Sequence, residues 1–373
     1  MEIQWSDGRE IINEIYWSRN LSLEEVREKE KSCDLLRVWY PQNIDDRIYE
    51  QYGDGLTYIE YNGRWKGKAY SAGIDLTQDA AEIMGCFSKT RRYEIRRAME
   101  RDNLYIDFYQ PNTRLECNEF FDFYNEFAKS KGRTDIAKGK AYALMENGRL
   151  IIAKISSAEN EILSMHGYIA DEDSKRVALY TSSSLFREKI DIANLIGRAN
   201  GLLHYKCMLY FKEKGYSIYD FGGIYKGNDN IQLQNITQYK MSFGGKLIEF
   251  DNSVVIPFHL IRGIDAFLET NRDILKTNKR IVWGAAQSGK YLLYRMNRLN
   301  IPASCVIDNR LSDENDSYVK DSILSEYEPN DTIIIVTTSI ENYGKIVKQE
   351  NCTKYAENNS LVCMKKEIER MCI

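Results

Sequence analysis

Three hydrophobic runs follow one another in the middle of the chain and predict an antiparallel sheet. LIIAKISS, EILSMHGYIA and RVALYTSSS are separated by short polar turns, which is the spacing of a strand meander. A helix over about residues 192–214 follows and stops at Gly215. The hydrophobic pattern therefore predicts three consecutive strands and then a long helix.

The segments that flank this meander complete a longer predicted order. LYIDFY and the amphipathic NEFFDFYNEFAKSKG precede it, and SIYDFGG indicates a strand that runs into a glycine turn. Segment 105–250 is thus predicted to run strand, helix, helix, three strands, long helix, strand, helix, strand. Upstream, we expect a helix in LSLEEVREKEKSCDLL, a helical stretch over about residues 79–101, and strands in LRVWY, LTYIEYN and AYSAGIDL.

A different pattern begins near Ile256. The helical HLIRGIDAFLETNRDIL leads into RIVWGAAQSGKYLLYRMNRLNIPASCVIDNR, which predicts a βαβ unit, and DTIIIVTTS predicts a further buried strand. The predicted fold class is α/β: an α+β core with a mixed sheet, and a small Rossmann-like domain after it. The predicted parts are an N-terminal α+β part at 1–105, a core at 106–256, a helical linker at 257–277 and a Rossmann-like domain at 278–373.

Composition narrows the classes of protein. A length of 373 residues favours two compact units, and a net charge of -4 speaks against a wholesale basic surface for DNA. No run of about 18 uncharged apolar residues occurs, and the first residues lack the build of a secretion signal. The eight cysteines form no CxxC pair, so we expect reduced thiols, no bound metal and a cytoplasmic location.

Three local motifs resemble the GNAT-like Fem family of peptidoglycan-bridge aminoacyltransferases and their acyl-transferring relatives in exopolysaccharide pathways. The motifs are SKTRRYEIRRAMERD, LLHYKCMLYFKEKGYSIYDFGGI and QYKMSFGGKLIEF, and the resemblance spans roughly residues 80–250. It implies acyl or aminoacyl transfer, with acyl-coenzyme A or aminoacyl-tRNA as donor. FREKIDIANLIGRANG has no clean version of the glycine loop that holds coenzyme A, so the donor stays open. Fem proteins carry two GNAT-like halves, and residues 1–105 are interpreted as a degenerate first half.

Transfer to an amine needs a neutral nitrogen, a route for its proton and donors for the developing oxyanion. Lys240 matches the lysine of the family's K-x-x-F-G-G motif, which the resemblance places beside the scissile bond; alternatively it is an exposed helix lysine. Asp220, at the end of the Y-D-F-G-G strand, could accept the proton or simply cap backbone amides. His204 on the long helix is a further candidate base, with His166 as its rival and a structural histidine as the alternative.

Candidate substrate-binding residues lie near the same motifs. The resemblance implies a groove where two strands splay apart, near the MHGYIA and LYTSSS strands. Tyr180 and Ser182 could hydrogen-bond a substrate there, and Asn200 lies on the long helix. Phe243 belongs to the K-x-x-F-G-G turn and is more typical of a structural position.

A basic helix precedes the core. Its positively charged residues form either a solvent-exposed face or a phosphate-binding face. The second interpretation is possible because the guanidinium group of Arg can bond two phosphate oxygens at once. An activated-sugar diphosphate, coenzyme A or tRNA would each satisfy it. The cations proposed to hold phosphates are Lys89, Arg92 and Arg96.

The C-terminal segment IVWGAAQSGKYLLYRM resembles small Rossmann-like modules attached to sugar-modifying enzymes of surface-polysaccharide pathways. Gly284 and Gly289 flank a loop that lacks the middle glycine of G-x-G-x-x-G, and Asp308 lies near the place of a ribose-binding acid. Tyr291 replaces the Ser/Thr of a Walker A loop, which argues against NTPase activity. Nucleotide binding and a structural or homo-oligomerising role both stay open.

These patterns lead to one principal function and two alternatives. The principal prediction is an N-acyltransferase acting on an amino sugar or nucleotide-linked sugar in cell-surface polysaccharide biosynthesis. The first alternative is an aminoacyl-tRNA-dependent aminoacyltransferase for a peptidoglycan precursor. The second is a non-catalytic nucleotide-sugar binding protein.

Overall fold

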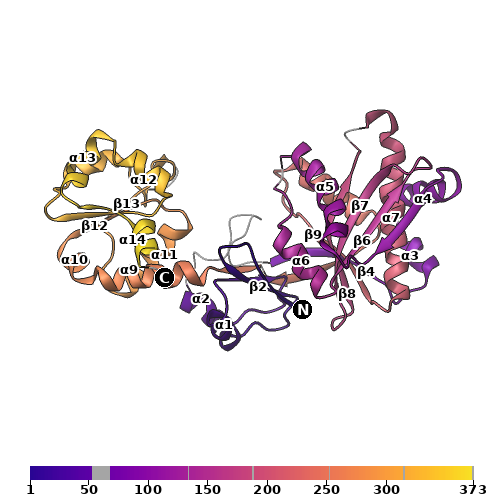
Figure 1. The fold of residues 1–373 in the computed structure, drawn as a ribbon, viewed down its shortest axis with the longest axis horizontal. Coiled ribbons are helices and arrows are strands. Elements are labelled where there is room, and N and C mark those ends of the chain that lie inside the picture. Colours follow the sequence, from indigo (N-terminus) through magenta and orange to yellow (C-terminus); the bar gives the residue numbers. More distant parts are fainter. Residues whose placement is uncertain (53–67, 133, 187–188, 252, 314–315, 372–373) are drawn as a thin grey trace. The chain divides into compact units, whose positions relative to one another are not determined.

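The computed structural model describes residues 1–52, 68–132, 134–186, 189–251, 253–313 and 316–371 (Figure 1). The chain forms two compact units. Unit 1 comprises Met1–Asn20, Val38–Asn43 and Ile59–Ser253; unit 2 comprises Leu21–Arg37, Ile44–Tyr58 and Val254–Ile373. The second half of the chain thus changes units close to the predicted end of the core at residue 256, whereas the first 105 residues are shared between both units.

A seven-stranded mixed sheet forms the centre of unit 1, in the order β10-β4-β9-β8-β7-β6-β5. Among the described strands of this sheet, the β8–β9 pair alone is parallel, and the other neighbours are antiparallel. The strands are β4 (Lys68–Asp75), β5 (Tyr105–Tyr109), β6 (Leu150–Ser156), β7 (Ile162–Asp171), β8 (Arg176–Ser184), β9 (Ile218–Gly223) and β10 (Lys246–Asp251).

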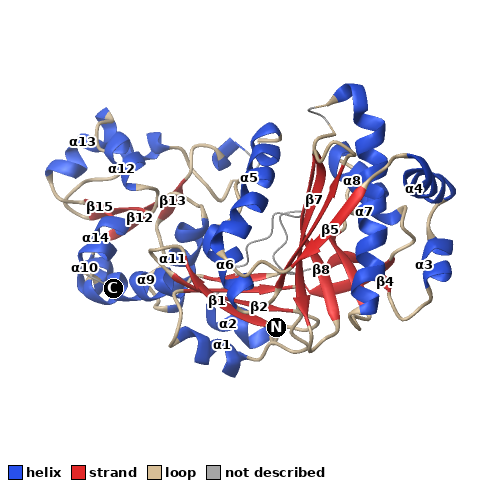
Figure 2. Cartoon of the chain, turned by 45° about the vertical axis from the view of Figure 1, so that its right-hand side comes forward, coloured by secondary structure: helices blue, strands red, loops and turns tan. Residues whose placement is uncertain are grey.

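Helices cover both faces of this sheet (Figures 1 and 2). His166 of β7 bonds to α7 (Ala193–Glu213), whereas a side chain at the next residue, Gly167, would meet Phe120 of α5 (Arg114–Ser130). Because successive strand residues point to opposite sides, α7 and α5 lie on opposite faces. We name these the α7 face and the α6 face, since α6 (Lys138–Glu146) packs beside α5.

The order of elements in segment 105–250 is the predicted one: β5, α5, α6, β6, β7, β8, α7, β9, α8 (Ile231–Met241) and β10. The mixed α/β fold class and the predicted order of elements in this segment are therefore confirmed. The predicted strand LTYIEYN lies outside the described residues. No helix in the described part of the chain is long and apolar enough to cross a membrane.

The predicted helix at 79–101 is two helices, α3 (Ala80–Cys86) and α4 (Lys89–Arg101). Phe87 between them is extended and fully buried, and the Ser88 side chain accepts a hydrogen bond from the Arg91 amide. Ser88 therefore starts a new helix as its N-cap, which the uninterrupted helical periodicity did not reveal.

The glycine turn of the K-x-x-F-G-G motif requires glycine for two reasons. Gly244 has φ +72°, and a Cβ atom there would lie 2.2 Å from the Cys86 carbonyl oxygen. Both the left-handed backbone and the close approach of a second chain segment exclude a side chain. The turn fixes the end of α8 against α3.

Unit 1 also contains an N-terminal hairpin that the sequence pattern did not predict. Strands β1 (Glu2–Ser6) and β2 (Ile11–Tyr16) pair antiparallel. Asn13 and Glu14 of β2 are 2% and 0% exposed. Two buried polar residues in a row break the alternation by which a half-buried strand is recognised.

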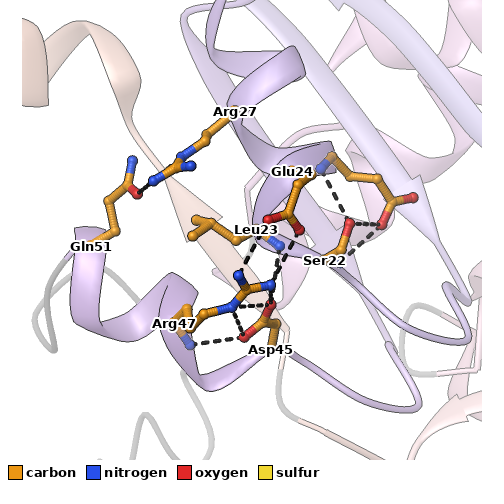
Figure 3. A network of polar contacts seen from close by, with 8 residues as sticks. Ser22, Leu23, Glu24, Arg27, Asp45, Arg47 and Gln51 are labelled. Atoms are coloured by element: carbon orange, nitrogen blue, oxygen red, sulfur yellow. Dashed lines mark hydrogen bonds and ion pairs between the residues drawn. The ribbon is translucent and has the colours of Figure 1, made fainter.

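The N-terminal contribution to unit 2 is a pair of short helices, α1 (Leu23–Glu30) and α2 (Asp46–Tyr52). Arg47 binds Asp45 at 2.6 Å and Glu24 at 3.2 Å. Figure 3 marks both contacts with dashed lines. The hydrogen bonds from Arg47 lower the pKa of Asp45 to about 2. The strand β3 (Leu35–Trp39) carries the chain from unit 2 into unit 1.

The rest of unit 2 contains a parallel sheet in the order β13-β12-β14-β15, as the predicted βαβ pattern requires. The predicted helix after residue 257 is split at Asn271 into α9 and α10. The strands of this sheet are β12 (Lys279–Trp283), β13 (Cys305–Ile307), β14 (Thr332–Val336) and β15 (Leu361–Cys363), whereas β11 (Val254–Ile256) lies outside it. The helices are α9 (Phe258–Thr270), α10 (Arg272–Thr277), α11 (Gln287–Arg298), α12 (Ile340–Ile346), α13 (Glu350–Glu357) and α14 (Met364–Arg370).

Candidate functional site

The sheet of unit 1 opens between β8 and β9. The two strands pair only from Arg176 opposite Ile218 to Ala178 opposite Asp220, although β8 continues to Ser184. Their edges beyond this point face each other without pairing. The resemblance placed the groove near the MHGYIA and LYTSSS strands; these two stay paired, and the divergence lies between the LYTSSS and YDFGG strands.

A β-bulge in β8 accounts for the divergence. Leu179 lies opposite Tyr168 of β7 and Thr181 lies opposite Gly167, so Tyr180 is the extra residue. A bulge bends its strand and leaves the extra residue outside the ladder. The bend begins directly after the last residue that pairs with β9.

On the α7 face, four buried side chains form one hydrogen-bonded chain. His166 Nδ1 lies 2.9 Å from the Tyr168 hydroxyl, which lies 2.9 Å from the Tyr219 hydroxyl, which lies 2.7 Å from His204 Nδ1. None of the four is more than 1% exposed, and the two imidazole centroids are 4.2 Å apart. Both candidate histidines therefore belong to one network.

Asn200 fixes the direction of this chain. Its amide nitrogen donates to the Tyr239 hydroxyl at 2.7 Å, so its oxygen accepts from His166 Nε2 at 2.8 Å. With its proton on Nε2, neutral His166 accepts at Nδ1, and each hydroxyl then donates toward His166. The chain ends with His204 donating from Nδ1 to Tyr219, which leaves a lone pair on its Nε2.

Burial keeps both imidazoles neutral. It lowers the pKa of His166 to about 4, against a smaller opposite effect of the Asn200 hydrogen bond. Burial lowers the pKa of His204 well below its ordinary value, and the charges of Arg91 and Lys240 act in the same direction. Both imidazoles are therefore weak bases at neutral pH.

Asp220 lies on the opposite side of β9, because Tyr219 before it faces α7. Its carboxylate accepts from the Gly222 amide at 2.7 Å and from the Ser71 hydroxyl at 3.3 Å, and Arg176 is 3.9 Å away. Burial raises its pKa, although Arg176 and these hydrogen bonds oppose the shift. The cap on Gly222 expected as the alternative is present, and the raised pKa leaves the carboxylate better suited to accept a proton.

Lys240, in the last turn of α8, donates to the Gly223 carbonyl oxygen at 2.7 Å. Its positive charge lowers the pKa of both Asp220 and His204. The structure therefore brings the three candidate catalytic residues together around the end of β9, with His204 on the α7 face and Asp220 on the α6 face.

The candidate substrate-binding residues of the core separate into two groups. Tyr180 is the bulged residue at the opening, Ser182 lies opposite His166 across the β7–β8 pair, and Asn200 joins the histidine network. Phe243 is 0% exposed and its ring packs 5.3 Å from His204, so its place is in the core.

The candidate phosphate-binding residues of the basic helix α4 also fall into two groups. Arg92 donates to the carbonyl oxygens of Gly85 and Phe87 at the end of α3. Lys89 and Arg96 are exposed and make no ion pair or hydrogen bond with the described residues. Arg96 and Lys89 therefore remain available to a phosphate, whereas Arg92 has a structural contact.

Sequence reasoning missed Arg91 as a member of the site. Its guanidinium lies over the rings of Tyr239 at 4.5 Å and Phe243 at 4.8 Å and binds Glu94 at 2.9 Å. Its helical phase was the available signal, since Arg91, Ile95 and Ala98 recur at helical spacing and the latter two are buried.

The sequence also gave no sign of a buried ion pair on the α6 face. Lys140 of α6 lies 2.8 Å from Glu14 of β2, with side-chain exposures of 12% and 0%. The Lys140 ammonium is 5.3, 5.4 and 5.3 Å from the ring centroids of Tyr16, Trp39 and Tyr180, which we call the aromatic cage.

Glu14 is held by four donors. Oε2 accepts from Tyr16 at 2.5 Å and Trp39 at 2.6 Å besides Lys140, and Oε1 accepts from Trp5 at 3.1 Å. Burial raises the pKa of Glu14, but the Lys140 charge and the hydrogen bonds outweigh it and place the pKa below its ordinary value. The pair is therefore charged at neutral pH.

In unit 2, the candidate nucleotide-binding residues form a tightly packed loop. A Cβ at Gly289 would lie 1.8 Å from the Gly284 carbonyl oxygen, so the second glycine allows α11 to approach β12. Asp308 accepts from the backbone amides of Ala285, Arg310 and Leu311. Its carboxylate thus has structural partners at the end of β13.

No group of three or more His, Cys, Asp or Glu residues that could hold a metal ion occurs in the described part of the chain. A scan against protein-family models and a search of curated proteins return no match.

Comparison with solved structures returns matches of low sequence identity. FemX matches with a TM-score of 0.45 and 13% identity, covering 62% of this chain and 75% of FemX. The L-PGS structure from Bacillus licheniformis matches with 0.39 and 14%, covering 69% and 83%. A tandem GNAT protein from the clavulanic acid biosynthesis pathway matches with 0.36 and 7%, covering 62% and 67%.

Proposed function

We propose that the chain is an acyl- or aminoacyltransferase that acts on an amino group of a sugar or nucleotide-linked sugar in cell-surface polysaccharide biosynthesis. The observation that carries this proposal is the opening after the Tyr180 bulge, with Lys240 and Asp220 at its β9 side. Unpaired strand edges provide backbone donors and acceptors for the linker of an acyl donor.

The proposed mechanism is direct attack of the neutral amine on the donor carbonyl. A carbon–nitrogen bond forms, the thioester or ester bond to the donor breaks, and the amine loses one proton. The departing sulfur or oxygen takes up one proton, so the donor leaves as free coenzyme A thiol or as tRNA with a free ribose hydroxyl group. Asp220 accepts that proton, for which its raised pKa suits it. Lys240 stabilises the negative charge on the carbonyl oxygen in the transition state.

A specific observation favours aminoacyl-tRNA as the donor in a second candidate function. The exposed side of α4 presents Lys89, Arg96 and Arg97, none of them paired with described residues, with Tyr93 63% exposed among them. Cations interleaved with an aromatic ring bind a phosphate backbone and an unstacked base.

Replacing Lys240 by Ala tests the catalytic proposal. The wild-type protein is incubated with acyl-coenzyme A, charged tRNA and a pool of amino-sugar nucleotides, and products are found by mass spectrometry. Because an oxyanion donor contributes transition-state stabilisation, we expect the variant to lose activity by about 100-fold to 1,000-fold.

Lys246→Ala is the matched control, since Lys246 is an exposed lysine on β10. It should keep the wild-type rate. A Lys240→Ala variant with undiminished transfer would remove Lys240 from the mechanism. Loss of activity after RNase treatment of the reaction would identify the tRNA donor.

A further inference from the structure

The aromatic cage lies directly beside the opening of the sheet. Tyr180 belongs both to the cage and to the bulge, and it lies two residues after Ala178, the residue paired with Asp220. Trp17 extends the cage: its ring lies 5.5 Å from Tyr16, and the Arg176 guanidinium lies 5.6 Å from it. Aromatic rings and the candidate proton acceptor thus share the α6 face.

These rings are not closed off as a core would be. Trp17, Trp39 and Tyr180 are each only partly buried, whereas Tyr16 behind them is 4% exposed. Partly exposed flat rings over a buried polar base form the kind of wall that lines ligand sites. The apolar C–H face of a pyranose stacks on such rings.

Two hydrogen-bond donors on this wall have no partner among the described residues. The Trp17 indole nitrogen is buried without an acceptor. The Tyr180 hydroxyl makes no hydrogen bond with the rest of the described chain. Burying a donor without an acceptor costs free energy. A hydrogen bond to an oxygen atom of a ligand would remove this cost.

The charges of the wall cancel in pairs. Lys140 is paired with Glu14 and Arg176 with Asp220. A site of this composition offers hydrogen bonds and ring faces without a demand for net charge. That combination suits a hydroxyl-rich ring better than a phosphate or a peptide.

The backbone at this wall is strained. Trp17 and Tyr40 have φ of 53° and 52°, in the left-handed region that bulky residues avoid. The Trp17 amide donates to the Trp39 carbonyl oxygen at 2.9 Å and so ties the two segments together. Such strain is kept where the surroundings fix a side chain in one orientation.

We propose that Trp17, Trp39 and Tyr180 bind the sugar ring of the acceptor, with the ring stacked on the aromatic faces and its hydroxyl oxygens bonded to Trp17 and Tyr180. This inference rests on the proposed function, because it identifies the acceptor side of the same opening. It places the amino group of the sugar toward Asp220.

The proposal is tested by measuring the binding of D-glucosamine to the full chain with saturation-transfer NMR. The ring protons should receive saturation, and Tyr180→Phe and Trp17→Phe should each weaken binding about fivefold to tenfold, the effect of one lost hydrogen bond. Tyr105→Phe, on the edge strand β5 and 62% exposed, is the control and should bind as the wild type does. Serinol, an acyclic amine with two hydroxyl groups, should bind at least about tenfold more weakly.

Two outcomes would overturn the proposal: glucosamine that receives no saturation, or binding that both variants leave unchanged while their circular dichroism matches the wild type. Transfer assays separate it from the proposed function. Equal acylation of serinol and glucosamine would keep the transferase and refute the sugar site. Ring binding that depends on Trp17 and Tyr180, without any acyl transfer, would support the sugar site and refute the transferase.

Discussion

Lys140→Met should destabilise unit 1 by about 3 kcal/mol, because it leaves the Glu14 carboxylate buried without its cation. This loss of stability is at the lower end of what is usual when a buried ion pair loses one partner, because Tyr16, Trp39 and Trp5 still donate hydrogen bonds to Glu14. Urea unfolding at pH 7, with pulse hydrogen exchange of β2 and α6 peptides as the readout, measures the loss.

The double variant Glu14→Gln/Lys140→Met is the matched control. It removes both charges and keeps one carbonyl oxygen for Tyr16 and Trp39, but it puts an NH2 group against the Trp5 donor. About half of the lost stability should therefore return. The Lys140→Met variant should also gain relative stability at acid pH, because protonation neutralises the stranded carboxylate. Single and double variants that are equally unstable would show that Lys140 acts through packing in the cage alone.

The sequence alone could predict the elements of the core but not this pair. Hydrophobic runs and turns are local signals, so the order from β5 to β10 followed from them. Glu14, Lys140 and Tyr180 come from three distant segments, and no local pattern records that they meet. In β2, the buried Asn13 and Glu14 even concealed the strand, because polar letters indicate exposure unless their partners are known.

The candidate site, too, was only partly predictable from the sequence. Motifs placed Lys240, Asp220 and His204 near one another, since Asp220 lies in β9 and the other two lie in the helices before and after it. They could not show that His204 and His166 share one network, which depends on the register of β7 against α7. Nor could they locate the opening, which results from the single extra residue in β8.

The second large expected effect concerns pH and arises from the histidine network. The free energy of unfolding of unit 1 should fall as the pH is lowered from 6.5 to 4. In the unfolded chain a histidine binds a proton near pH 6.5, whereas folded His166 binds one only near pH 4. Between these values the unfolded state holds more protons, so the free energy of unfolding falls as the pH falls. His166 alone accounts for a loss of about 3 kcal/mol across this window, and His204 acts in the same direction.

His204→Asn separates this effect from other acid-sensitive groups. An Asn side chain can keep the hydrogen bond that His204 Nδ1 makes to Tyr219 but binds no proton, so the pH dependence should become shallower by about 1.4 kcal/mol per pH unit. Asp220, with its raised pKa, contributes to the pH dependence in the opposite direction. Its contribution is the same in both proteins, so it cancels when their slopes are compared.

His259→Asn, in unit 2, controls for loss of an imidazole elsewhere. Urea unfolding at pH 7, 6, 5 and 4.5, with pulse hydrogen exchange of α7 peptides, supplies the slopes. Equal slopes for the wild type and His204→Asn would mean that His204 is already protonated in the folded chain, and that the neutral hydrogen-bonded chain from His204 to Asn200 does not exist.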